Sequence, residues 1–164
     1  MSSETEDLPP SGQIPSAEGR FAVVRATFYM DLAERLTAGA LKGFQEEGIE
    51  QSSVEVFDVP GAFELPLAAK VCAASGAYAG VACLGAVIRG ETDHYDWVSS
   101  AAAHGIELVQ VQTGVPCAFG LLTVENHDQA LARSGGDKRD QGYNAALVVV
   151  RMSRLMTELG TPGA

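Results

Sequence analysis

The sequence is poor in positive charge and has no long apolar run. Its 164 residues include 11 lysines and arginines against 21 acidic residues, a formal net charge of -10, and such a surface repels nucleic-acid phosphates and anionic membranes. No segment reaches the roughly 18 consecutive apolar residues that span a bilayer. The N-terminus is acidic and proline-rich, whereas a secretory signal is basic and apolar. We therefore expect a cytoplasmic protein that binds neither nucleic acid nor membranes.

Cysteine is also scarce. The three cysteines, Cys72, Cys83 and Cys117, lie in apolar stretches and form no C-x-x-C pair, which indicates reduced, buried thiols rather than a disulfide framework. The three histidines have no metal-ligand spacing, so we expect no metal site. The G-x-S-x-G motif of serine hydrolases and the H-E-x-x-H motif of zinc proteases are both missing.

The composition is otherwise that of a globular protein. Hydrophobic residues make up 46% and charged residues 20%, which excludes a disordered chain, a collagen-like repeat and a coiled coil. The length fits a single domain. We expect a flexible acidic leader over residues 1–19, which contain no lysine or arginine, and one α/β domain over residues 20–160.

Apolar runs alternate with helical patterns along this domain. Strands are expected at 21–24, 54–59, 80–88 and 117–124, and helices at 32–48, 63–74, 95–113, 126–133 and 142–159. Residues 108–112 alone could also alternate as a strand, but the length of the pattern favours a helix. The alternation implies right-handed βαβ crossovers. We predict a three-layer α/β sandwich, with a doubly wound, four-stranded parallel sheet covered by helices on both faces.

Ligands of open α/β sheets bind beyond the carboxyl ends of the strands. Four segments are expected at that edge of the sheet. Three of them lie at or after the ends of predicted strands, and the fourth follows the helix after the last strand; they are 27–29, 60–64, 86–94 and 133–141. Each one alone is explained as a turn or as packing at the rim of the sheet. Their convergence at one edge favours a binding site.

The segment 85–92 has glycines spaced as in the P-loop motif G-x-x-x-x-G-K-[ST], but Glu91 stands where the lysine belongs. A carboxylate there repels the β- and γ-phosphates, which argues against a nucleoside triphosphatase. Gly90 and the N–H groups that open the next helix can still hold a single phosphate. A glycine turn without a ligand explains the spacing equally well. If a ligand binds, a small phosphoester fits best.

Two further residues suit the chemistry of a phosphoester. His94 begins the helix after this segment, and histidine exchanges its proton readily near neutral pH. His104 and His127 are better explained as surface or helix-cap residues. Arg133 ends a short helix before a loop of glycines and charged residues, and a guanidinium can donate two parallel hydrogen bonds to a phosphate.

Three stretches together resemble the 6,7-dimethyl-8-ribityllumazine synthases: VPGAFELP at 59–66, LGAVIRGETDHYD at 84–96, and GLLTVEN at 120–126 with QALAR at 129–133. The resemblance runs from about Phe21 to Leu159 and implies a flavodoxin-like strand order. It implies a transferase that condenses 5-amino-6-(D-ribitylamino)uracil with (2S)-2-hydroxy-3-oxobutyl phosphate, the penultimate step of riboflavin biosynthesis. No metal or organic cofactor is implied.

The resemblance also implies the roles of single residues. Those that bind the aminopyrimidine are the stacking ring of Phe28, the ribityl-binding Ala62, Phe63 and Glu64, and the backbone of Ala86, Val87 and Ile88.

For the phosphorylated hydroxyketone, main-chain groups of Glu91 and Thr92 bind the phosphate and His94 transfers protons. Phe119 and Arg133 correspond to groups that a neighbouring subunit contributes, the first over the ring and the second on the phosphate.

Assembly follows from the same resemblance. The family forms pentamers, decamers and sixty-subunit icosahedral capsids, so a homo-oligomer built from pentamers is implied, with active sites between subunits. Part of the leader around Ile14 is expected to pair with a neighbour's sheet.

Two positions depart from the family pattern. Gln141 replaces a lysine near the phosphate, a charge that Lys138 or Arg139 can supply instead, and Tyr29 replaces a smaller polar residue. Gln141 favours one alternative, namely a catalytically weakened protein that binds a lumazine or a flavin. A scaffold whose main role is shell formation is the other alternative.

Overall fold

The computed structural model describes residues 7, 19–135 and 139–160 of the chain. Its centre is a sheet of four parallel strands in the order β2-β1-β3-β4. In chain order the strands are β1 (Phe21–Ala26), β2 (Val54–Val59), β3 (Gly80–Ile88) and β4 (Cys117–Val124). The predicted sheet is confirmed, and only β1 departs from its predicted bounds, by two residues at its end.

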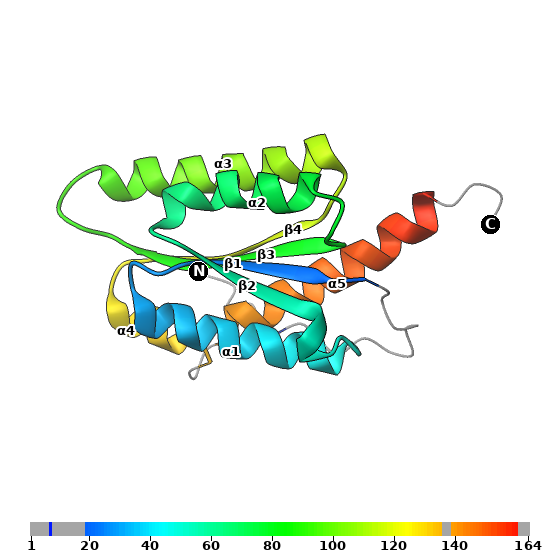
Figure 1. The fold of residues 1–164 in the computed structure, drawn as a ribbon. Coiled ribbons are helices and arrows are strands. Elements are labelled where there is room, and N and C mark those ends of the chain that lie inside the picture. The colour runs from blue at the N-terminus through cyan, green and yellow to red at the C-terminus, as the bar shows by residue number, and fades with distance from the viewer. Residues whose placement is uncertain (1–6, 8–18, 136–138, 161–164) are drawn as a thin grey trace.

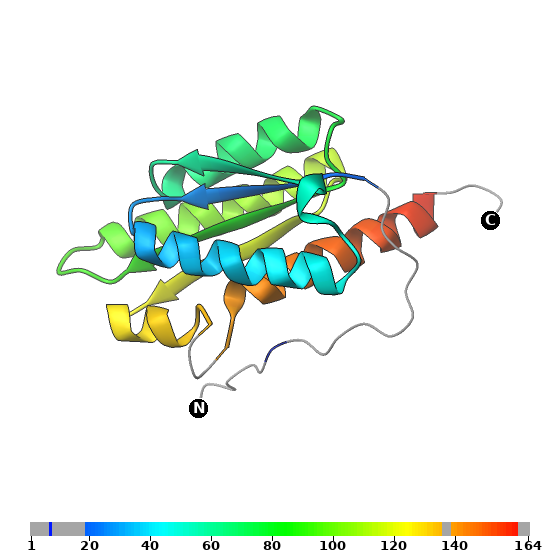
Figure 2. The same ribbon diagram turned by 60° about the horizontal axis from the view of Figure 1, so that its bottom comes forward.

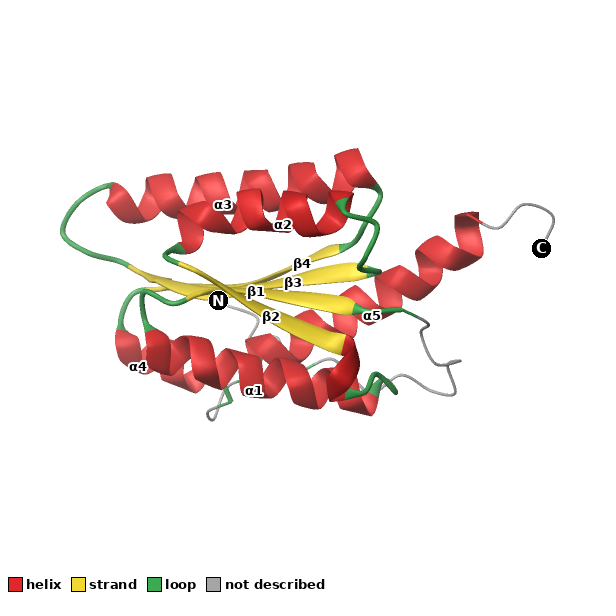
Figure 3. Cartoon of the chain, viewed as in Figure 1, coloured by secondary structure: helices red, strands yellow, loops and turns green. Residues whose placement is uncertain are grey.

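Helices cover both faces of this sheet, as predicted. They are α1 (Met30–Glu46), α2 (Leu65–Ala74), α3 (His94–Thr113), α4 (His127–Ala132) and α5 (Gln141–Gly160), with short 3-10 helices at Gln51–Ser53 and Ala62–Glu64. Figures 1 and 3 show α2 and α3 on one face, and α1, α4 and α5 on the other. The ambiguous residues 108–112 belong to α3.

Strand β3 is the innermost element. It pairs with β1 on one side and with β4 on the other, and residues 80–87 are all buried. A strand that is covered on both faces has no side open to water, which is why its sequence is a continuous apolar run rather than an alternating one. Its end therefore provides a rigid support for the residues that follow it.

Successive residues of β1 point into two separate cores. Phe21 and Val23 pack with the inner faces of α1 and α5, whereas Ala22 and Val24 pack with α2 and α3. Burial of each large apolar side chain contributes about 1.5–3 kcal/mol. The two cores hold the three layers together and fix where the strands end.

Helices α1 and α5 approach each other closely at Gly142. A Cβ atom at this position would collide with the carbonyl oxygen of Leu36, so only glycine allows the two helices to cross here. Tyr143, the next residue, donates a hydrogen bond of 2.5 Å from its hydroxyl to Glu46. The pKa of Tyr143 is raised to about 12, mainly because of this hydrogen bond.

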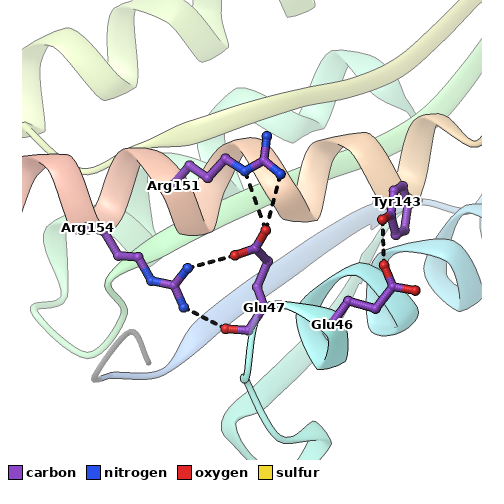
Figure 4. Close-up of polar contacts among 5 residues, drawn as sticks. All are labelled: Glu46, Glu47, Tyr143, Arg151 and Arg154. Carbon is purple, nitrogen blue, oxygen red and sulfur yellow. Dashed lines mark hydrogen bonds and ion pairs between the residues drawn. The ribbon is translucent and has the colours of Figure 1, made fainter. Parts of the chain in front are cut away.

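A buried ion-pair cluster joins the residue after α1 to the second half of α5 (Figure 4). Only 3% of the Glu47 side chain is exposed, and its carboxylate lies 2.7 Å from Nη1 of Arg154 and 3.3 Å from Nη2 of Arg151. Arg154 also donates a hydrogen bond of 2.6 Å to the carbonyl oxygen of Glu47. A buried carboxylate requires such partners, because burial removes it from water.

The side chain of Asn126 caps the start of α4. The side chain of Asn126 accepts a hydrogen bond of 2.8 Å from the N–H of Gln129. Because this cap satisfies a free N–H group, replacing Asn126 with alanine is expected to lower the free energy of unfolding by about 1 kcal/mol. Chemical denaturation of the two proteins measures the difference, and an aspartate variant, which keeps the acceptor, serves as the control.

Most of the leader, including Ile14, and Lys138 lie outside the described residues, so the expected pairing of the leader stays a prediction. Asp7 is described, and its carboxylate accepts a hydrogen bond of 2.9 Å from the N–H of Asp140. Among the described residues, no helix has the length and hydropathy needed to cross a membrane.

Candidate active site

A cavity of about 630 Å³ opens at the edge of the sheet where the strands end. The walls are formed by the connections that follow β1 and β2, by the end of β3 and by the first turns of α3. The lining residues are Phe28, Tyr29, Pro60, Gly61, Ala62, Phe63, Glu64, Ala86, Val87, Ile88, His94, Trp97 and Val98. The cavity thus lies at the position at which open α/β sheets bind their ligands.

Eight of the residues predicted from the sequence line this cavity together. They come from three separate parts of the chain and are Phe28, Ala62, Phe63, Glu64, Ala86, Val87, Ile88 and His94. Strand β1 ends just before the first of them, and β3 ends with the last three before His94. The fold therefore brings together residues as far apart in the sequence as Phe28 and His94.

Three aromatic rings on the cavity wall are exposed to solvent. The exposed fractions of Phe28, Phe63 and Trp97 are 75%, 64% and 74%, although large apolar side chains are usually buried. The ring of Tyr29 contacts that of Phe28 edge to face, with centroids 4.9 Å apart. Exposed rings around a cavity are suited to stack on a planar ligand.

Trp97 lines the cavity but was not predicted from the sequence. It lies three residues after His94 on α3, so the two side chains share one face of the helix. The same holds for Val98, four residues after His94. A signal was available, since Trp97 is the only tryptophan of the chain and its spacing from His94 places it beside the same cavity.

His94 is held at the first turn of α3. Its N–H donates a hydrogen bond of 3.3 Å to Oγ1 of Thr92, and the N–H groups of Asp96 and Trp97 donate to the carbonyl oxygen of Asp93, at 3.0 and 3.2 Å. The side chain of His94 is exposed to solvent in the cavity. An exposed imidazole at this position can accept a proton from a bound molecule or donate one to it.

Glu91 and Thr92 adjoin the cavity without lining it. They belong to the exposed loop that connects β3 to α3. With Gly90, they leave main-chain N–H groups next to the start of α3, where the helix dipole favours an anion. Their expected role in phosphate binding stays a prediction.

Phe119 and Arg133 lie outside the cavity and are connected to each other through Gln141. The side-chain amide of Gln141 donates a hydrogen bond of 3.1 Å to the carbonyl oxygen of Phe119, and its N–H donates one of 2.9 Å to that of Arg133. Arg133 caps α4, and its Nη1 donates to the carbonyl oxygen of Gln129. These two predicted residues therefore form a separate group on one subunit.

The cysteines stay protonated at neutral pH. Burial is the main cause of a raised pKa at all three thiols. The pKa of Cys72 is raised, that of Cys83 lies well above its ordinary value, and that of Cys117 is raised to about 11. A thiol reacts as its thiolate, so burial disfavours the reactive form of all three residues. Among residues 7, 19–135 and 139–160, no group of three or more histidine, cysteine or acidic side chains is placed to hold a metal ion.

The strand order, the helices on both faces and a cavity at the carboxyl ends of the strands define a flavodoxin-like α/β protein. This class hosts many activities, so the site and not the fold indicates the function. Comparison with known families gives a narrower answer, because the family described as 6,7-dimethyl-8-ribityllumazine synthase matches residues 18–157. The chain belongs to this family, which places it in riboflavin biosynthesis and implies small-molecule substrates and oligomeric assembly.

Proposed function

We propose that this chain condenses 5-amino-6-(D-ribitylamino)uracil with (2S)-2-hydroxy-3-oxobutyl phosphate to give 6,7-dimethyl-8-ribityllumazine. The observation that carries the proposal is the position of His94 in one cavity with exposed aromatic rings and the end of β3. The rings suit a planar pyrimidine, and the backbone at the end of a strand offers hydrogen-bonding groups to its edge. The proposed reaction uses no metal or organic cofactor, as the family resemblance implies.

The chemistry consists of proton transfers between two molecules held together. An amine of the pyrimidine attacks the ketone and water leaves to give an imine; phosphate is then eliminated as a proton is removed; tautomerisation and ring closure release a second water. Holding both reactants in one cavity contributes up to roughly 7–11 kcal/mol in favourable cases. His94 is the residue that moves the protons.

A single subunit provides fewer binding groups for the phosphate than for any other part of the substrates. Glu64 is the charged residue in the cavity wall, and a carboxylate repels a phosphate. In our proposal Arg133 of a neighbouring subunit binds the phosphate together with main-chain N–H groups of residues 90–92, and Phe119 of that subunit covers the pyrimidine. The connection of Arg133 with Phe119 through Gln141 supports this arrangement, because both residues then arrive together.

Exposed apolar side chains on α2 and α3 support the homo-oligomer. Leu67 and Val71 of α2, and Leu108 and Val111 of α3, are all exposed on a single subunit. Apolar groups exposed on neighbouring helices indicate a surface that another chain covers. We infer a ring of five subunits, in which each cavity faces the Arg133 of the next subunit.

An assay with both substrates tests the proposed reaction. The wild-type protein is expected to form the fluorescent lumazine. An Arg133→Ala variant should raise the KM for the phosphoester about tenfold or more, since a hydrogen bond to a charged group contributes about 1.5–3 kcal/mol, and should leave the KM for the pyrimidine nearly unchanged. Arg20→Ala is the matched control, because Arg20 precedes β1 at the opposite edge of the sheet and pairs with Glu55.

A protein that binds a lumazine or a flavin without turnover is the second candidate. The observation in its favour is Gln141, whose amide is bonded to the carbonyl oxygen of Phe119 and carries no charge toward a phosphate. Purified protein that is yellow but forms no lumazine would support it. A shell whose role is structural is a third possibility, and light scattering of the purified protein measures its size.

A further inference from the structure

We propose that Arg89 is a positioning residue for His94 and for the loop before it; this proposal rests on the proposed function. Arg89 directly follows β3, and its N–H continues the sheet by donating a hydrogen bond of 2.9 Å to the carbonyl oxygen of Val124. Its backbone is therefore fixed by the most buried strand of the protein. Its side chain extends from this support toward the first turn of α3.

The guanidinium of Arg89 makes three contacts at once. Its Nε lies 3.0 Å from a carboxylate oxygen of Glu125, which follows β4. Its Nη1 lies 3.7 Å from the carboxylate of Asp96, and its face lies over the ring of Tyr95, 4.2 Å from the centroid. Tyr95 and Asp96 are the two residues that follow His94. Arg89 thus joins the ends of two strands to the first turn of α3.

These contacts restrain both ends of the loop over residues 89–93. Figure 2 shows this loop extending beyond the sheet at the edge where the strands end. Residues 89–94 are all exposed, so packing restrains the loop little. A small rotation of the first turn of α3 would move the imidazole of His94 away from the cavity. Arg89 opposes that rotation because it contacts the two residues that follow His94.

Arg89 is suited to this task and poorly suited to bind the phosphate itself. The carboxylates of Glu125 and Asp96 flank its guanidinium, and they would repel a phosphate next to it. A planar guanidinium can bond to carboxylates through its edge and stack on a ring through its face, whereas a lysine ammonium is a point charge. We therefore expect arginine to be required here, not merely positive charge.

Kinetics and amide exchange of Arg89→Lys and Arg89→Gln test the proposal. Both variants are expected to lower kcat about tenfold or more, because a small misplacement of a catalytic group has effects of this size, with the KM of either substrate within about twofold. Glu125→Gln should lower kcat in the same direction, and the Arg89→Gln/Glu125→Gln double variant should be no worse than Arg89→Gln alone. Arg20→Gln, which removes a similar charge at the other edge of the sheet, should keep wild-type kcat.

Hydrogen exchange gives a readout that does not depend on activity. In both Arg89 variants the N–H groups of Asp96 and Trp97 are expected to exchange at least about fivefold faster, since the turn that protects them opens more often. The Arg20→Gln variant should exchange as the wild type does.

Three results would overturn the proposal. A higher KM for the phosphoester at unchanged kcat would show that Arg89 contacts the phosphate directly. Full activity of Arg89→Lys would show that charge suffices, and unchanged exchange at Asp96 and Trp97 would show that Arg89 does not hold this turn. If the wild-type protein forms no lumazine, the proposed function fails, and the exchange measurement still decides whether Arg89 restrains the helix.

Discussion

Replacement of His94 with alanine is expected to lower kcat by about 10²- to 10⁴-fold, which is the range for removal of a positioned acid or base. The cavity walls and the first turn of α3 do not depend on the imidazole, because the turn is held through main-chain N–H groups. The KM values should therefore change little. The measurement is the initial rate of lumazine formation at saturating concentrations of both substrates.

His104→Ala is the matched control for this variant. His104 lies on the same helix, ten residues further on, and is also exposed, but it does not line the cavity. It should keep at least about half of the wild-type kcat, since surface substitutions usually have small effects. Equal losses in the two variants would mean that His94 acts through the helix and not through proton transfer.

Mixing two impaired variants, assayed at a phosphoester concentration well below the KM of Arg133→Ala, tests whether the site forms between subunits. His94→Ala supplies an intact Arg133, and Arg133→Ala supplies an intact His94. If each site joins one cavity to the next subunit of a ring, random reassembly of equal amounts restores about a quarter of the sites. If both residues act within one subunit, the mixture should be no more active than its components.

Replacement of Glu47 with glutamine is expected to lower the free energy of unfolding by about 3–5 kcal/mol, because it removes the buried carboxylate that pairs with Arg151 and Arg154. The amide keeps the shape of the carboxylate, so the loss reports charge and not packing. Urea denaturation at a fixed protein concentration measures the change, since assembly also contributes to stability.

Glu46→Gln is the control for this second substitution. Glu46 is the preceding residue, is exposed, and accepts the hydrogen bond of Tyr143. Its loss should be no more than about 1 kcal/mol, since glutamine keeps an oxygen that can accept this hydrogen bond. Similar unfolding midpoints for the two variants would contradict the view that the cluster of Glu47 stabilises the contact of α1 with α5.

The sheet and the helices could be predicted because their signals are local. The apolar run of β3 and the periodic pattern of α3 lie within single windows of sequence, and the capping residue Asn126 stands next to the helix that it begins. The end of β1 was placed two residues too early, because pairing with β2 and β3 extends the strand past its apolar run, through Arg25 to Ala26. Such pairing is not visible in the pattern of one segment.

Part of the site was predictable for a different reason. His94 and the residues after β1 and β3 stand where parallel strands end, so a rule about the edge of the sheet brings them together. The contacts of Arg89 with Glu125, and of Glu47 with Arg154, join residues 36 and 107 positions apart. No periodicity indicates such pairs, since they depend on how complete elements pack.

The direction of α5 has a practical consequence for the use of this protein. Its last turn lies at the end of the domain opposite the loop before α3, as Figure 1 shows. A fluorescent reporter or an affinity label fused after α5 would therefore leave the domain far from the mouth through which substrates enter.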